Sequence, residues 1–118
     1  GKCEYWQWAG GDVFKATPNN PNLIDALEQL FNSDIQFHGV IVIVSYYARC
    51  IFRFGSTFFV FEPHEWSPSK VAALFQADSL FEAYELLLHL MELPKSKSTK
   101  PVEYGIDYVK ITRLEGMF

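Results

Sequence analysis

Basic side chains are scarce in this sequence, and their scarcity excludes one large class of functions. The 118 residues contain 10 Lys and Arg against 14 Asp and Glu, which gives a formal net charge of −4. Nucleic-acid-binding domains normally carry a basic surface for the phosphate backbone. The one short basic segment, PKSKSTKP at 94–101, is interleaved with Ser, Thr and Pro and is typical of a solvated loop. We therefore expect no nucleic-acid partner.

Cysteine is nearly absent, since the chain has only Cys3 and Cys50. Two cysteines do not make a disulfide framework, and with three dispersed histidines they show no zinc-type spacing. The sequence also lacks a glycine-rich phosphate loop and the short motifs that bind common cofactors. We expect no metal, no cofactor and a reducing, intracellular location, in the cytoplasm or the nucleus.

Long apolar segments are missing as well. The β-branched run from Val40 to Val44 is far shorter than the roughly 20 residues of a membrane-spanning helix, so no membrane association is expected. A chain of 118 residues is long enough for one core. We expect a single domain over 1–118, whether it is complete or a fragment of a longer chain.

Aromatic residues, in contrast, are abundant. They make up 17% of the sequence, and 11 of them are Phe. Such a surplus fills a core or covers a partner-binding surface. Trp6, Trp8 and Trp66 are candidates for partner binding, because Trp is enriched at interface hot spots. The alternative for each is an ordinary aromatic at the rim of the core.

The hydrophobic pattern predicts two helices. Asn20-Pro21 has the form of a cap followed by a first-turn proline, and apolar residues then recur at helical spacing over 22–32. Ser79 and Glu82 fit a capping box that starts a second helix, which we expect to end at about Leu93.

Strands are predicted between these helices. Val40 to Val44 suits a central strand, and the following YARCIFRF alternates between a largely charged and an apolar side. Gly55-Ser56 joins it to TFFVFE as a two-residue turn of type II′. Within this strand pair, Cys50 is expected to be a small core residue.

Three further segments complete the predicted sheet. We expect a short strand around Asp12–Ala16, another at Val71–Ala77, and a last one at IDYVKITRL, 106–114, lying at an edge. The order of the elements predicts an α+β domain, with a central antiparallel sheet of about four to five strands packed by two helices.

The stretch FVFEPHEW at 59–66 carries the candidate chemistry. Side chains two residues apart on an extended chain point to the same side, so Glu62 and His64 are expected to lie together. A carboxylate beside an imidazole fixes the ring's tautomer and stabilises its protonated form, as a general base next to a thiol requires. The alternative is a histidine in a polar loop after a strand.

The segments around this pair resemble a known family. LIDALEQLF, GVIVIVSYYARCIFRF, TFFVFEPH and VAALFQADSLFEAYELLLHL lie between about Leu23 and Leu90. In this order they resemble the herpesvirus tegument deubiquitinases and their eukaryotic and transposon-borne relatives, which are papain-like cysteine peptidases. The resemblance implies the sheet half of such a fold. It also implies His64 as the general base and Glu62, in place of the family's usual Asp, as its orienting acid.

The family's nucleophile has no counterpart in this chain. That Cys opens a helix far upstream of the histidine, whereas Cys3 is soon followed by Gly10-Gly11 and lies only about 60 residues before His64. Cys50 lies in the middle of a predicted strand. A base without a thiol catalyses no acyl transfer, so Glu62 and His64 are a partial or vestigial catalytic site.

Three functions remain open at the level of sequence. The one we favour is a non-catalytic protein-protein interaction module, a pseudoenzyme whose partner is a protein, a ubiquitin-like one included. The second is the His/acid half of an active ubiquitin-type thiol peptidase whose Cys lies outside this chain. The third is an oligomerisation domain, a homo-oligomer that pairs through the predicted edge strand at 106–114.

Overall fold

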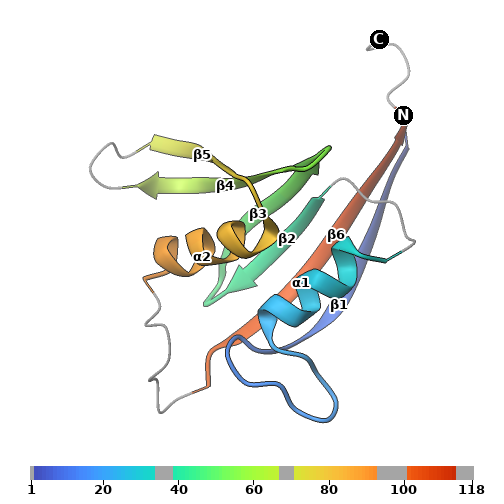
Figure 1. Ribbon diagram of the computed structural model, residues 1–118, viewed down its shortest axis with the longest axis vertical. Coiled ribbons are helices and arrows are strands. Elements are labelled where there is room, and N and C mark those ends of the chain that lie inside the picture. Colours follow the sequence, from blue (N-terminus) through green and yellow to red (C-terminus); the bar gives the residue numbers. More distant parts are fainter. Residues whose placement is uncertain (1, 34–38, 67–70, 93–100, 114–118) are drawn as a thin grey trace.

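A six-stranded antiparallel sheet forms the centre of the computed structural model (Figure 1). The structure describes residues 2–33, 39–66, 71–92 and 101–113, and only the backbone at 2–9, 65–66, 71 and 108–113. The strands lie in the order β1-β6-β2-β3-β4-β5, and all neighbours are antiparallel. The elements are β1 (Lys2–Asp12), α1 (Leu23–Phe31), β2 (Gly39–Val44), β3 (Tyr47–Phe54), β4 (Thr57–Trp66), β5 (Val71–Ala77), α2 (Leu80–Leu90) and β6 (Glu103–Arg113). The predicted α+β class is confirmed.

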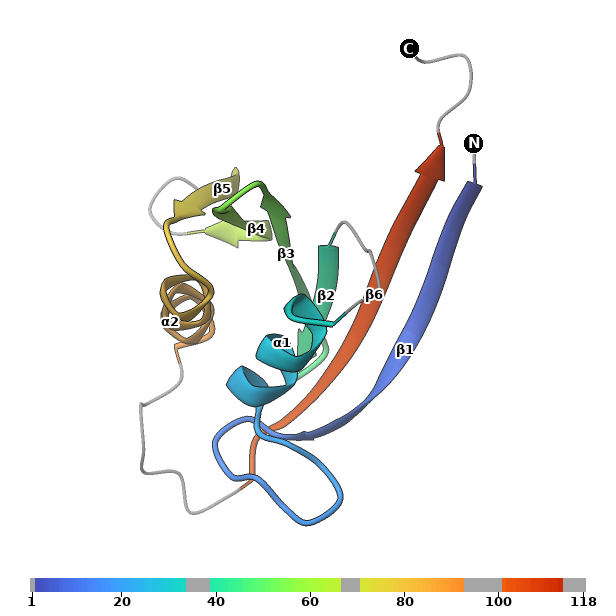
Figure 2. The same ribbon diagram turned by 45° about the vertical axis from the view of Figure 1, so that its right-hand side comes forward.

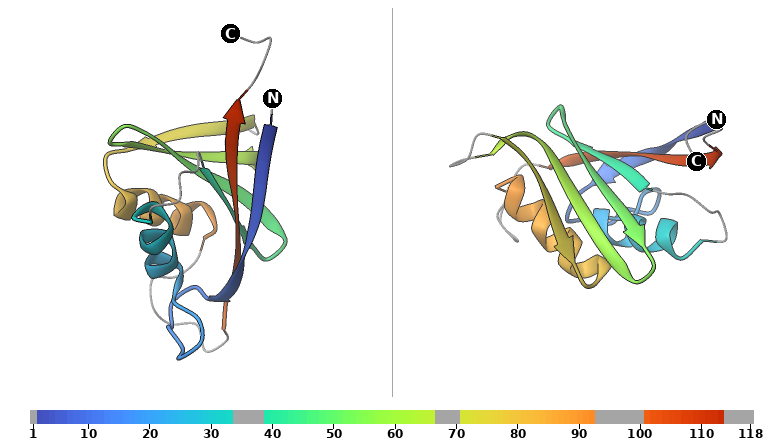
Figure 3. Two further views of the ribbon diagram at one scale, coloured as in Figure 1. Left: turned by 90° about the vertical axis from the view of Figure 1, so that its right-hand side faces the viewer. Right: turned by 90° about the horizontal axis from the view of Figure 1, so that it is seen from above.

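Both helices lie on one face of the sheet, which we call the inner face; the opposite one is the outer face (Figure 3). The core is packed between the inner face and the apolar sides of the two helices. It is built from Leu23, Ala26, Leu27, Leu30 and Phe31 of α1, Ala83, Tyr84, Leu87, Leu88 and Leu90 of α2, and alternate residues of the strands, among them Val40, Val42, Val44, Ile51, Phe58, Val60 and Ile106.

The cap of helix α1 lies two residues later than predicted, although the predicted range of 22–32 agrees with the helix to within one residue at each end. Its N-cap is Asn22, whose side-chain oxygen accepts a hydrogen bond of 3.0 Å from the amide of Asp25. The predicted cap, Asn20, is held in a preceding turn, because its carbonyl accepts from the amide of Thr17 at 2.8 Å. Pro21 therefore precedes the cap instead of following it.

Helix α2 begins at the predicted cap. Ser79 accepts a hydrogen bond of 3.1 Å from the amide of Glu82, and the Glu82 carboxylate accepts one of 2.9 Å from the amide of Asp78. In the usual capping box the carboxylate accepts from the amide of the N-cap residue itself. Here Glu82 accepts from the amide of Asp78, the residue before the N-cap. The helix ends at Leu90, earlier than the predicted Leu93.

Two tight hairpins set the register of the central strands. Gly55 has a φ of +62°, and Phe54 pairs with Thr57, so the predicted two-residue turn is confirmed. The hairpin between β2 and β3 turns through Ser45 and Tyr46, which have φ of 51° and 68° although neither is glycine. Such left-handed residues cost conformational energy.

Two expectations about the ends of the sheet are wrong. The strand predicted around Asp12–Ala16 is instead β1, which ends at Asp12 and gives the sheet six strands. Because β1 pairs along β6, the C-terminal strand lies between β1 and β2 and is not an edge (Figure 2). Gly10-Gly11 lies at a register shift, which the ladder between β1 and β6 absorbs as a bulge.

The two sides of β3 also face in unexpected directions. Arg49, Ile51 and Arg53 lie on the inner face, where Ile51 is in the core and Arg53 donates to the carbonyl of Phe31 at 3.3 Å. Cys50 lies on the outer face, half-buried, and not in the core as predicted. Alternation shows that the two sides of a strand differ, but it does not show which of them the helices cover.

Gly10→Ala is expected to lower the free energy of unfolding by about 1–3 kcal/mol, whereas Gly105→Ala leaves it nearly unchanged. A Cβ at Gly10 would lie 1.7 Å from the carbonyl oxygen of Tyr104, while a Cβ at Gly105 would meet nothing within 4 Å. The backbone of the bulge must therefore shift for alanine to fit. Urea unfolding followed by circular dichroism measures both variants, and equal losses would contradict the close approach of β1 and β6.

Candidate functional site

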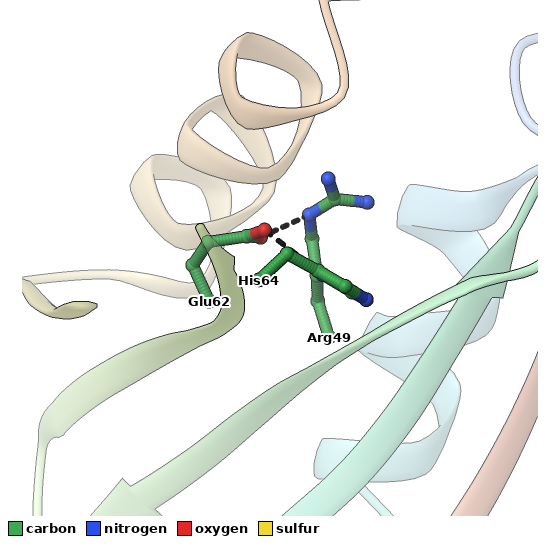
Figure 4. Close-up of polar contacts among 3 residues, drawn as sticks. All are labelled: Arg49, Glu62 and His64. Carbon is green, nitrogen blue, oxygen red and sulfur yellow. Dashed lines mark hydrogen bonds and ion pairs between the residues drawn. The ribbon is translucent and has the colours of Figure 1, made fainter. Parts of the chain in front are cut away.

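Glu62 and His64 point to the same side of β4 near its end. Glu62 pairs with Ala73 of β5, and a register shift follows between Glu62 and Trp66, in which His64 lies. Nδ1 of His64 is 3.0 Å from Oε1 of Glu62 (Figure 4). The structure thus brings together the two residues that the sequence predicts to share a side.

A third residue, Arg49 of β3, completes this arrangement, and sequence reasoning missed it. Its Nε donates to Oε2 of Glu62 (Figure 4). Cys50 pairs with Phe61. One step further from the hairpin turn, Arg49 and Glu62 therefore lie opposite each other. Arg49 is 8% exposed and Glu62 only 3%. Alternation places Arg49 on the same side of the strand as Ile51, but the sequence does not show that this side enters the core, so no sequence signal identified Arg49.

Tyr47 packs against the histidine from the neighbouring strand. Its ring centroid lies 5.0 Å from that of His64, with an interplanar angle of 86°, an edge-to-face contact. The guanidinium carbon of Arg49 lies 5.9 Å from the same tyrosine ring. We call Tyr47, Arg49, Glu62 and His64 the Glu62 cluster.

The Glu62 cluster holds the imidazole ring of His64 in one orientation. Both carboxylate oxygens of Glu62 have a partner, one in Arg49 and one in His64, so the burial of this charge is compensated. With its proton on Nδ1, His64 donates to the carboxylate, which leaves Nε2 to accept a proton. The His64 side chain is 36% exposed, so a reacting group can approach its ring.

Neither cysteine of the chain lies near this imidazole. Cys50 is next to Arg49 on β3 and therefore points to the outer face, and burial raises the pKa of its thiol, which disfavours the reactive thiolate. Cys3 is in β1, where it pairs with Ile111. Strands β6, β2 and β3 separate β1 from β4, a distance of roughly 19 Å at the usual strand spacing.

The structure places the backbone of the three candidate tryptophans but not their side chains. Trp6 and Trp8 pair with Tyr108 and Ile106 of β6, and Trp66 pairs with Val71 of β5. Their side chains lie outside the part of the chain that is described. Their role in partner binding stays a prediction.

The remaining candidates add no further site. His89 is exposed on α2, and His38 lies outside the described residues. In the described ranges, no three His, Cys, Asp or Glu side chains are grouped so that they could hold a metal ion. Neither α1 nor α2, the helices of those ranges, is long and apolar enough to cross a membrane.

Arg49→Met is expected to lower the free energy of unfolding by about 3–5 kcal/mol, because the buried carboxylate of Glu62 loses its cation. Replacing both partners, in Arg49→Met with Glu62→Leu, should cost clearly less than the sum of the single changes. Arg53→Met is the matched control on the same strand; Arg53 is exposed, and its loss should cost less than about 1 kcal/mol. Urea unfolding of the four variants checks this, and equal losses for Arg49→Met and Arg53→Met would contradict it.

Comparison with known proteins supports the fold. No protein-family profile and no curated protein matches this chain. A solved structure that does match is the ubiquitin-specific protease encoded by the murine cytomegalovirus tegument protein M48, in complex with a ubiquitin-based suicide substrate. The TM-score is 0.69, with 18% sequence identity, over 98% of this chain and 50% of that chain.

The chain thus spans about half the length of the protease that it matches. At this level of identity the likeness concerns the arrangement of the backbone. It agrees with the α+β fold and with the resemblance to a deubiquitinase found in the sequence. The 118 residues have the fold of one half of a ubiquitin-specific protease.

Proposed function

We propose that this chain is a protein-interaction module with a degenerate, deubiquitinase-like cysteine-peptidase fold, and that it does not catalyse by itself. The observation that carries this proposal is the position of the two cysteines relative to His64. Cys50 points to the opposite face of the sheet, and Cys3 belongs to the strand at its far edge. Without a thiol in reach, the Glu62–His64 pair has no nucleophile to deprotonate.

Two exposed tyrosines are the proposed binding surface, namely Tyr47 of the Glu62 cluster and its neighbour in the sequence, Tyr46. Tyr46 is fully exposed and Tyr47 more than half exposed, at the turn between β2 and β3. Tyr46 keeps its left-handed backbone without being glycine, and such strain is concentrated at functional sites. Tyrosine is also enriched at interface hot spots. A ubiquitin-like protein is the proposed partner, because the similar protease was crystallised with a ubiquitin-based substrate.

Addition of the 118-residue chain to ¹⁵N-labelled ubiquitin is expected to shift a contiguous set of amide resonances. Tyr46→Ala should weaken this binding about tenfold or more, since an exposed aromatic anchor is lost. Phe81→Ala, at an exposed aromatic on α2, is the matched control and should leave it unchanged.

The same chain is expected to release no fluorophore from a ubiquitin C-terminal coumarin amide. Unperturbed resonances in the titration would contradict the ubiquitin-like partner. Hydrolysis that Cys3→Ser abolishes would contradict the non-catalytic role.

A second candidate function is favoured by the Glu62 cluster itself, namely the acid–base half of a thiol peptidase. In that case a cysteine thiol from polypeptide outside these residues gives its proton to Nε2 of His64. The thiolate sulfur then bonds to the carbonyl carbon of the substrate. As the C–N bond breaks, the amine leaves with the proton from the imidazolium, while Glu62 holds the ring in place. Arg49 donates to the Glu62 carboxylate and holds it in this orientation.

Whether His64 can act as such a base is testable by supplying the thiol. Tyr47 packs on His64 from the neighbouring strand, so Tyr47→Cys, in a Cys3→Ser, Cys50→Ala background, places a sulfur beside the imidazole. We expect its alkylation by iodoacetamide at neutral pH to slow about tenfold when His64→Ala is added, because an imidazolium favours the thiolate.

Tyr46→Cys, at the fully exposed neighbouring position, is the matched control, and its alkylation should not depend on His64. A rate for Tyr47→Cys that is the same with and without His64 would rule out a competent base at this position.

A further inference from the structure

The outer face of the sheet carries a cluster of aromatic side chains. Phe52 of β3 and Phe59 of β4 are stacked, with centroids 5.4 Å apart and an interplanar angle of 17°. Phe54 lies edge-on to both, at 5.8 Å and 6.0 Å. Phe61 of β4 and Leu74 of β5, which pair with each other, continue this surface towards the sheet edge. We call these five residues the outer aromatic face.

No helix covers this surface in the described part of the chain, because α1 and α2 both pack on the inner face (Figure 3). Phe54 is 67% exposed and Leu74 58%. An antiparallel sheet with one covered face usually presents polar side chains on the other. A contiguous apolar surface in their place marks an interaction site.

The charge distribution indicates what covers it. Among the outer-face positions of β3, β4 and β5 whose side chains are described, none carries a charge; these are Ala48, Cys50, Phe52, Phe54, Thr57, Phe59, Phe61, Pro63, Ala72, Leu74 and Gln76. Asp107 of β6, which pairs with Ile41 of β2, lies beyond this uncharged region. Two copies of a chain with a net charge of −4 repel each other, and this repulsion is weakest where they meet through a surface without charges. The outer aromatic face is such a surface.

We propose that the outer aromatic face is the interface of a homodimer, in which two copies pack sheet against sheet about a twofold axis. Stacked and edge-on phenylalanine rings suit this packing, because the same surface on the partner offers rings and gaps of the same kind. With Ile41 and Ile43 of β2, the apolar strip is four strands wide, roughly 15 Å at the usual spacing. A strip of this width buries less area than the ~800 Å² per partner of a standard interface. The dimer is therefore weak, and its population depends on concentration.

This interface differs from the strand pairing expected from sequence. The strand at 106–114 cannot serve as a free edge, because β1 covers β6. A dimer could instead add strand to strand along β5, the edge next to the outer aromatic face. The two arrangements respond differently to substitution, since Phe54 is on β3 and far from that edge, whereas Leu74 is on β5.

Sedimentation equilibrium of the 118-residue chain from about 5 to 500 μM is the test. The wild-type chain is expected to pass from monomer to dimer over this range. Phe54→Lys and Leu74→Lys should each raise the dissociation constant at least about tenfold, because they place like charges face to face in a desolvated contact. Phe81→Lys, which changes a side chain of equal exposure (56%) on α2, should leave it within about twofold. Circular dichroism verifies that each variant is folded.

Three outcomes would overturn the proposal. The first is a wild-type chain that stays monomeric at the highest concentration. The second is a dimer that Leu74→Lys abolishes and Phe54→Lys leaves intact, which identifies pairing along β5. The third is equal weakening by Phe81→Lys, which shows that added charge alone acts. Ubiquitin binding and the reactivity of Tyr47→Cys do not depend on this dimer, so its failure is separate from theirs.

Discussion

A buried carboxylate constrains this whole end of the sheet. Glu62 is almost fully withdrawn from water, and an ionised group there costs several kcal/mol unless it is paired. Arg49 and His64 remove that cost only while β3 and β4 keep the register that places Arg49 opposite Glu62. A slip of one residue would turn Arg49 to the outer face. The interaction that fixes the strand register is therefore the one that orients the imidazole.

The features predicted correctly are those decided within a few residues. The Ser79–Glu82 cap, the turn at Gly55 and the proximity of Glu62 to His64 depend on local geometry alone. The place of the C-terminal strand was wrong because it depends on β1, which comes from the other end of the chain. Arg49 was missed because its burial also depends on a residue of another strand, Glu62. An arginine is rarely buried unless its charge is paired. Alternation along one strand does not show which residue lies opposite on the neighbouring strand.

The reversal of the two sides of β3 explains why this domain is apolar on both faces. Arg49 is neutralised by Glu62, and the exposed Arg53 lies over the rings of Phe31 and Phe58, so both cations are accommodated on the inner face. The phenylalanines of the same strand are thereby left on the outer face. A sheet that is apolar on two sides is typical of one with a layer on each.

The pairing of β1 with β6 also determines how the chain reaches this structure. The two strands come from opposite ends of the sequence, Lys2 pairing with Arg113, so almost the whole chain is enclosed in the loop that their contact closes. Closing so long a loop is entropically unfavourable until other contacts have formed, and such non-local sheets fold slowly. The hairpins from β2 to β5 can form early during synthesis, whereas β1 has to wait for the last strand. Until then, its aromatic segment has no strand partner, and an unpaired strand of this kind is prone to aggregate.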